Sequence, residues 1–206
     1  MKRLVLSALV CLMPLSAHAQ DKVSDDEALA ILEESLPGTL MNNPLTSAWN
    51  SWGDDIKAKI VRAPNAPGES AYQVRVKKAK DQAWKISAVA TVEKGVAEGE
   101  TVLIAFWGRA EKMDPDNGQA RVYARLQQAA EPYTGVAERA VNLTSDWQIH
   151  YLSGVADQNY KDGSLNMTFQ IGDLQQTVEF GQFYVMNLGQ GVDPSSLPSG
   201  SVTPGQ

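Results

Sequence analysis

Apolar and polar side chains alternate along most of the chain from Leu40 onward, the pattern of strands that bury one face. In AYQVRVK (71–77), for example, Tyr72, Val74 and Val76 share one side. Clusters of Pro, Gly, Asn and Asp separate the alternating segments, as expected of turns. Short strands joined by regular turns predict an all-β fold, an antiparallel β-sandwich or jelly roll of roughly eight strands. The predicted strands are Ala71–Lys77, Trp84–Val92, Thr101–Arg109, Gly118–Gln128, Trp147–Gly154, Leu165–Ile171 and Thr177–Asn187, with one or two more within Trp49–Val61.

The β-sandwich, residues 40–189, is flanked by two segments of different character. Residues 20–39 predict one N-terminal helix, because Ser24 and Glu27 form a capping-box pattern and Pro37-Gly38 ends it. Its apolar residues suit a helix that packs beside the main domain. Residues 190–206 are rich in Gly, Pro and Ser, which predicts a disordered tail.

The first residues have the pattern of a secretory signal peptide. Lys2 and Arg3 precede a short apolar run, and Ala17-His18-Ala19 matches an A-x-A cleavage site. We therefore expect residues 1–19 to be removed near Ala19 and the mature chain to be periplasmic or secreted, without membrane insertion. The run is too short for a membrane-spanning helix.

Cleavage would remove the single cysteine, Cys11, and one of the two histidines, His18. Thiolate chemistry and disulfides are then excluded, and a metal site built from several histidines is excluded too, because His150 alone remains. The loss of two basic residues leaves 16 Lys and Arg against 24 Asp and Glu, a formal net charge of −8. An acidic chain does not attract polyphosphate, so we expect no nucleic-acid partner.

One predicted strand, GQARVYARLQQ (118–128), carries unusual side chains on its polar side. Arg121, Tyr123, Arg125 and Gln127 recur at every second position, about 6.6 Å apart along a strand. Aromatic rings stack on the apolar face of a sugar ring, and planar donors and amides bind its hydroxyls. The alternative is an ordinary solvent-exposed sheet face, for which Tyr and Arg are also common.

Two other strands favour the binding interpretation. The polar sides of Trp147–Gly154 and Leu165–Ile171 carry amides, hydroxyls and an imidazole in place of the usual Lys and Glu, which suits a neutral polar ligand. For Trp84 we leave two interpretations open, a core residue or a platform at the rim of the site. We expect the other tryptophans to be structural and Tyr133 to be an ordinary loop residue. The candidate ligand-binding residues are Trp84, Arg121, Tyr123, Arg125, His150 and Gln170.

The order of these segments resembles a known family. "GESAYQVRVKKAKDQAWKISA", "VAEGETVLIAFWGRA", "ARVYARLQ", "LTSDWQIHYLSGVA", "GSLNMTFQIG" and "GQFYVMNLG" together resemble a carbohydrate-binding module of the family 4/9 type, which has a galactose-binding-like jelly roll. The resemblance implies a non-catalytic cleft on the concave sheet, with Trp84 as one wall and Arg121, Tyr123 and Arg125 on its floor. Many members also bind a structural calcium through an acidic pair in the last strand. Met186-Asn187 stands there in this chain, so we do not assign calcium or any other cofactor.

We therefore expect an exported, non-catalytic protein that binds plant-type or envelope polysaccharide on the concave face of a β-sandwich. Two alternatives stay open. A small jelly-roll polysaccharide lyase would use arginine or amide groups against a uronate, and Tyr123 or His150 to move protons. An envelope assembly or accessory protein would instead contact an envelope protein through its N-terminal helix and C-terminal tail.

Overall fold

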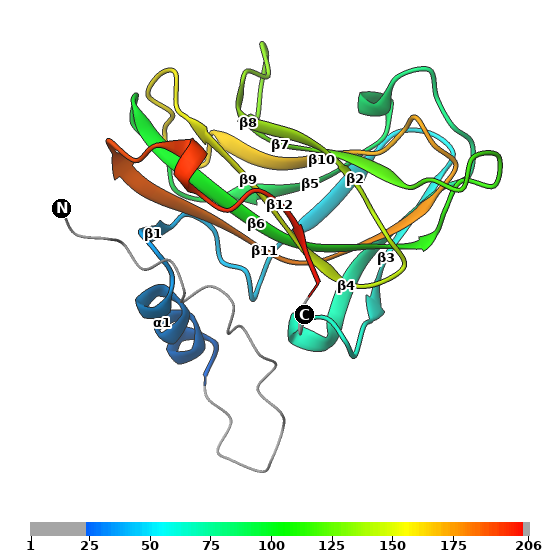
Figure 1. Cartoon of the computed structure of the whole chain (residues 1–206), viewed down its shortest axis with the longest axis horizontal. Helices are drawn as coiled ribbons and strands as arrows, with labels where there is room; N and C mark the ends of the chain where they lie inside the picture. The colour runs from blue at the N-terminus through cyan, green and yellow to red at the C-terminus, as the bar shows by residue number, and fades with distance from the viewer. Residues whose placement is uncertain (1–23, 204–206) are drawn as a thin grey trace.

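The chain forms a β-sandwich of two antiparallel sheets with one α-helix beside it (Figure 1). The structure, a computed structural model, describes residues 24–203. The predicted all-β fold class is confirmed, but the described residues form twelve strands rather than roughly eight. Strands β1 (Thr39–Leu40) and β12 (Gly200–Val202) are too short for alternation to reveal, and the eight-residue strand β8 (Gly135–Asn142) was missed. The predicted signal peptide lies outside the described residues.

The larger sheet has seven strands, in the order β12-β9-β6-β11-β4-β3, with β1 also paired to β11. The long strands β6 and β11 run through its centre, where their apolar residues are buried on both faces. In chain order its strands are β1 (Thr39–Leu40), β3 (Ile56–Arg62), β4 (Ser70–Val76), β6 (Glu100–Lys112), β9 (Gln148–Val155), β11 (Thr177–Gln190) and β12 (Gly200–Val202).

The smaller sheet has five strands, in the order β2-β5-β10-β7-β8, and carries the predicted strand with Arg121, Tyr123 and Arg125 near its middle. Its burial alternates, as expected of a sheet with one face on the core and one face open. In chain order its strands are β2 (Trp49–Trp52), β5 (Ser87–Val92), β7 (Arg121–Gln128), β8 (Gly135–Asn142) and β10 (Leu165–Gln170).

Aromatic rings form the centre of the core between the two sheets. Trp49 stacks on Tyr72 at 5.2 Å and on Phe180 at 5.9 Å between ring centroids. Phe169, from the smaller sheet, lies 4.4 Å from Phe180 of the larger one. Contacts of this kind lock the sheets together, so the outer face of the smaller sheet rests on a rigid layer.

A second apolar cluster lies on the opposite face of the larger sheet. Trp107, Tyr151 and Tyr184 are buried there, and Leu29 and Leu32 of helix α1 (Asp25–Ser35) pack against them. The helix confirms the predicted cap, since the backbone N–H of Glu27 donates to the Ser24 hydroxyl at 3.2 Å. The larger sheet is therefore covered on both faces.

Two predicted boundaries are wrong. Residues 190–203 of the predicted disordered tail are ordered, because Pro194–Ser196 form a short 3-10 helix and β12 pairs with β9. The strand predicted to begin at Trp84 begins at Ser87 instead, after a 3-10 helix over Ala83–Lys85. No helix among residues 24–203 is long and apolar enough to cross a membrane.

Candidate functional site

The site lies on the outer face of the five-stranded sheet. Strand pairing places Trp52, Ser87, Gln170, Tyr123 and Ala140 in one row that crosses β2, β5, β10, β7 and β8 in turn. Their neighbours on each strand point into the core, so this row faces away from it. The adjacent row includes Thr168, Arg125 and Glu138, and the next includes Asn166 and Gln127.

A hollow of about 500 Å³ opens on this face. Three aromatic side chains line it and are unusually exposed: Trp84 is 56% exposed, Trp52 45% and Tyr133 45%. Large aromatic side chains normally gain free energy by burial, so three exposed rings around one hollow indicate a ligand surface. The remaining lining residues are polar or small: Arg125, Gln127, Ala129, Asn166 and Gln170.

The position of Trp84 favours the interpretation as a platform over that as a core residue. It lies in the 3-10 helix before β5, where the backbone turns its side chain out of the sheet. The indole N–H of Trp52 donates to the Trp84 carbonyl oxygen at 3.4 Å, which joins the two tryptophan-bearing segments on this side of the hollow. The ammonium of Lys85 lies 5.9 Å from the Trp84 ring centroid. Trp84 is thus a surface residue, while its role in ligand binding stays a prediction.

Two buried polar atoms on this face of the sheet have no hydrogen-bond partner in the structure. Gln127, which lines the hollow, is 5% exposed and its Oε1 is unpaired; Thr168, in the adjacent row and outside the lining, is 1% exposed and its Oγ1 is unpaired. A buried polar atom left unpaired costs about 1–3 kcal/mol, so such atoms are few in native structures. Both atoms accept hydrogen bonds, and the threonine hydroxyl also donates one.

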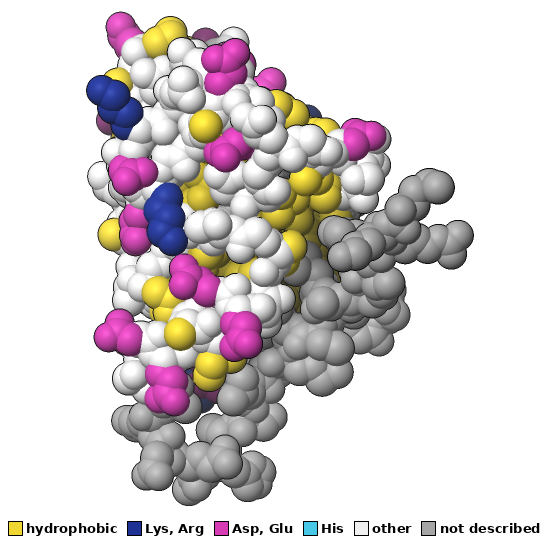
Figure 2. Space-filling view, turned by 90° about the vertical axis from the view of Figure 1, so that its left-hand side faces the viewer, with side chains coloured by type: hydrophobic (Ala, Val, Ile, Leu, Met, Phe, Trp, Pro, Cys, Tyr) yellow, Lys and Arg dark blue, Asp and Glu magenta, His cyan; other side chains and the backbone are white. Residues whose placement is uncertain are grey.

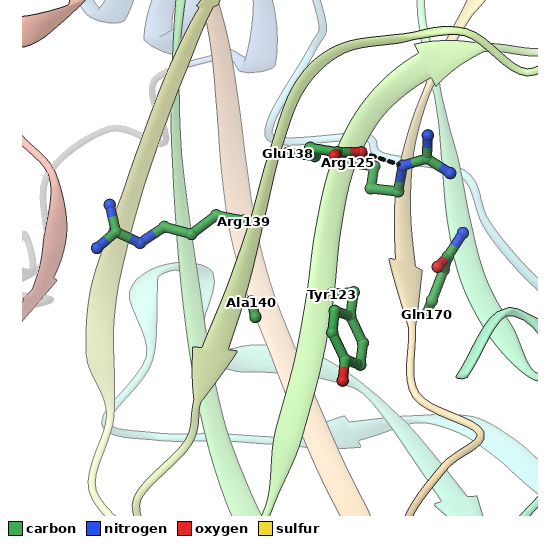
Figure 3. A pocket seen from close by; sticks show the side chains of 6 residues that line it. All are labelled: Tyr123, Arg125, Glu138, Arg139, Ala140 and Gln170. Carbon is green, nitrogen blue, oxygen red and sulfur yellow. Dashed lines mark ion pairs between the residues drawn. The ribbon is translucent and has the colours of Figure 1, made fainter. Parts of the chain in front are cut away.

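A second hollow, of about 420 Å³, adjoins the first and shares Arg125 and Gln170 with it. Arg125 Nε lies 3.1 Å from Glu138 Oε2 across the β7–β8 pair, without the alignment of a hydrogen bond. Figure 3 shows Tyr123, Arg125 and Gln170 around this hollow, whereas Arg139 extends to the other side of β8. The two hollows are neighbours on this face of the sheet, with Arg125 and Gln170 lining both, and we call the two together the groove.

Arg121 lies beside this groove rather than in its lining. Its guanidinium forms a 2.5 Å ion pair with Asp173 and lies 5.3 Å from the Tyr123 ring centroid. The hydrogen bond that the guanidinium donates to the Asp173 carboxylate, together with the negative charge of that group, raises the pKa of Arg121 above its ordinary value. The Tyr123 hydroxyl also donates to Asp173, at 3.3 Å. Arg121 thereby holds Tyr123 in place at the end of the groove.

The expectation that His150 faces the same surface is wrong. His150 is fully buried on β9 in the other sheet, where its ring lies 4.9 Å from that of Phe106 in the core. Burial lowers the pKa of His150 to about 4. The predicted alternation of Trp147–Gly154 is confirmed, but the side predicted to face the main core faces away from it. Ile149 and Tyr151 are buried in the second apolar cluster on the outer face of the larger sheet.

The calcium-ligand position of the resemblance is occupied by side chains with other partners. Met186 is fully buried, and the Asn187 amide donates to Glu100 Oε2 at 2.7 Å. Within residues 24–203 no group of three or more His, Cys, Asp or Glu side chains is arranged to hold a metal ion.

Four residues at the groove were missed or misjudged from the sequence: Trp52, Tyr133, Glu138 and Asp173. One of them could have been found. Residues three apart in a strand point to opposite faces, so Trp49 and Trp52 in WNSW cannot both be buried in one core. Tyr133 and Asp173 reach the site from connecting segments, and no local pattern marks such an approach.

Comparison with known proteins agrees with this geometry. The family model described as "Carbohydrate binding domain" matches residues 41–181, which contain every groove residue named above. No curated protein matches the chain.

Solved structures share the fold at low sequence identity. A structure described as "CBM4 structure and function" is 20% identical in sequence, with a TM-score of 0.52; the match covers 71% of this chain and 89% of that protein. The apo BiXyn10A CBM1 structure is 15% identical with a TM-score of 0.50, covering 69% and 92%. An arabinose-bound α-L-arabinofuranosidase, MgGH51, is 15% identical with a TM-score of 0.56, covering 74% of this chain but 27% of the enzyme. The match over residues 41–181 shows that the chain belongs to the family 4/9 carbohydrate binding domains.

Proposed function

We propose that the chain is a non-catalytic protein that binds a single polysaccharide chain, of plant or envelope origin, in the groove of the five-stranded sheet. The observation that carries this proposal is the presence of three exposed aromatic rings around one hollow that is otherwise lined by polar or small side chains, among them Gln127 with its unpaired amide oxygen. A sugar ring has apolar C–H faces and a rim of hydroxyls, so it complements both kinds of group.

Each part of the groove has a distinct role in this proposal. Trp84 and Trp52 stack on sugar rings from one side, and Tyr133 contacts them from the other. Gln127, Asn166 and Gln170 exchange hydrogen bonds with the hydroxyls. Tyr123 and Arg125 continue the contacts into the second hollow, which gives the groove room for more than one sugar unit.

The arrangement supports binding rather than catalysis. The lyase alternative relied on His150 as one proton carrier, and His150 is buried in the core on the other sheet. The two carboxylates beside Tyr123, those of Glu138 and Asp173, are each engaged with an arginine, Arg125 and Arg121.

Isothermal titration of the protein with xylan, β-glucan and mannan oligosaccharides tests the proposal. We expect saturable binding of at least one of them, weakened at least about tenfold by Trp84→Ala, as for an aromatic residue central to an interface. Trp84→Phe is the matched control, because it keeps an aromatic face and should keep most of the affinity. Equal affinities of wild type and Trp84→Ala would contradict the assigned groove, and absorbance from unsaturated uronate products would contradict the non-catalytic assignment.

We also propose that the protein is exported. The support is the basic, apolar and A-x-A pattern over residues 1–19. N-terminal sequencing of the protein from a bacterial expression host should give a mature chain that starts at Gln20. A chain that retains residues 1–19 in the cytoplasm would contradict this.

A further inference from the structure

Basic residues are concentrated in one part of this acidic protein. The chain has 24 Asp and Glu against 18 Lys and Arg, yet seven of the 18 lie between residues 57 and 80, with Glu69 as the single acidic residue there. This segment forms β3 and β4, which are labelled at the lower right of Figure 1, and the loop after β4. Figure 2 shows the side at the left of Figure 1, away from β3 and β4, where Asp and Glu outnumber Lys and Arg.

Five of these cations form what we call the basic edge: Lys57, Lys59 and Arg62 of β3, Arg75 of β4, and Lys77. Strand pairing places Lys57 beside Arg75, on the outer face of the larger sheet, and Lys59 lies two residues along the same face. Among the described residues, no carboxylate lies within ion-pair distance of any of the five. None of the five cations is therefore neutralised by an ion pair, and Asp55, which directly precedes β3, pairs with Lys80 instead.

Exposed apolar side chains accompany these cations. Ile60 is 62% exposed, more than any other large apolar side chain in residues 24–203. It shares the inner face of the edge strand β3 with Arg62, whereas Lys57 and Lys59 lie on the outer face, so a surface that meets the edge of β3 would contact both sets. Met113 is 39% exposed and directly follows Lys112 at the end of β6. Strand pairing puts Lys112 and Arg75 on either side of Thr177 of β11. A surface that combines unpaired cations with exposed apolar groups matches the boundary between lipid headgroups and acyl chains.

Protection of the sheet edge explains only part of this pattern. β3 is the last strand of its sheet, and lysines on an edge strand prevent pairing with other chains. Arg75, however, lies on β4, which is paired on both sides and needs no such protection.

We propose that the basic edge docks on the surface of an anionic lipid bilayer. A second copy of the chain would bring like charges together at β3, and a polyuronate offers no apolar layer for Ile60 and Met113. A bilayer offers a negatively charged plane with an apolar layer beneath it. The groove lies on the outer face of the other sheet, so a docked protein keeps its glycan site accessible.

Co-sedimentation with phosphatidylcholine vesicles, with and without phosphatidylglycerol, tests this proposal independently of glycan binding. We expect binding only to the anionic vesicles, weakened by added salt. Each Lys near an anionic surface changes the partition coefficient about fivefold, so the variant Lys57→Gln/Lys59→Gln should bind about 25-fold more weakly. The matched control, Lys94→Gln/Lys161→Gln, removes the same charge from loops outside β3 and β4 and should bind like the wild type.

A second pair of variants tests the apolar contribution. Ile60→Ser should weaken vesicle binding, whereas Ile31→Ser, which alters a similarly exposed isoleucine on α1, should not. The proposal is overturned if the wild type does not bind anionic vesicles, if it binds neutral vesicles equally, or if both lysine pairs weaken binding to the same degree. Binding to an acidic peptide or polyuronate without binding to vesicles also overturns it.

Discussion

His150 provides a test of the core that is separate from ligand binding. Its Nδ1 lies 2.7 Å from Ser201 Oγ of β12, and its Nε2 lies 3.4 Å from the Gly108 carbonyl oxygen. Burial lowers the pKa of His150 from 6.5 to about 4, because the charged imidazolium would lose its hydration. In the unfolded chain the residue titrates near its ordinary pKa. The unfolded state therefore binds a proton more readily than the folded state does.

The sign and size of the effect follow from this difference. The contribution of the neutral, buried His150 to the free energy of unfolding is fully present above about pH 6.5, because the residue is neutral in both the folded and the unfolded state there. It falls as the pH drops from about 6.5 to about 4, where the unfolded chain is protonated and the folded chain is not. The contribution lost is about 2 kcal/mol at pH 5 and about 3 kcal/mol at pH 4. This is a large part of the 5–15 kcal/mol that stabilises a typical domain.

Urea denaturation of wild type and His150→Gln at several pH values between 7.5 and 4 measures this contribution. Glutamine keeps a hydrogen-bonding side chain but does not titrate, so we expect the wild type to lose about 2–3 kcal/mol more than the variant across this range. Parallel slopes for the two proteins would refute the buried neutral histidine. Glycan affinity at pH 7.5 should be the same in both, and a selective loss in the variant would restore His150 to the site.

Other side chains give simpler expectations. Trp52→Ala should weaken glycan binding about threefold to tenfold but change the free energy of unfolding by less than about 0.5 kcal/mol, because its ring is half exposed. Calorimetric titration measures the affinity and urea denaturation the stability; an unchanged affinity would remove Trp52 from the groove. Phe169→Ala should cost about 3–5 kcal/mol in urea denaturation, and a cost below 1 kcal/mol would contradict its central packing. Arg109→Ala should cost about 3 kcal/mol in the same assay, because Glu179, 3% exposed, loses its 2.7 Å partner; a cost like that of a surface ion pair would contradict this.

The fold was predictable because alternation and turns are local signals. β7 illustrates this, since Val122, Ala124 and Leu126 are buried while Arg121, Tyr123 and Arg125 lie on the opposite, partly exposed face, as the sequence predicts. Alternation shows that a strand has two different faces, but it does not show which face meets the core.

For this reason the sequence predicted the wrong outward face for β9. Both faces of the larger sheet are covered, one by the smaller sheet and one by the second apolar cluster. The apolar side of β9 therefore packs into the second apolar cluster, on the face that carries helix α1. His150, on the other side of β9, faces the core between the two sheets. The expected disorder of residues 190–206 failed for a related reason, because β12 gains its order from pairing with β9 and not from its own composition.

The most direct test of glycan binding in the groove is an NMR titration that follows the five tryptophan indole N–H signals. We expect ligand to shift the signals of Trp84 and Trp52, which line the groove. The signals of Trp49, Trp107 and Trp147 should remain in place, because these rings pack in the two apolar clusters. Shifts confined to the three packed tryptophans, or saturable glycan binding that leaves Trp84 and Trp52 unmoved, would contradict the proposed groove.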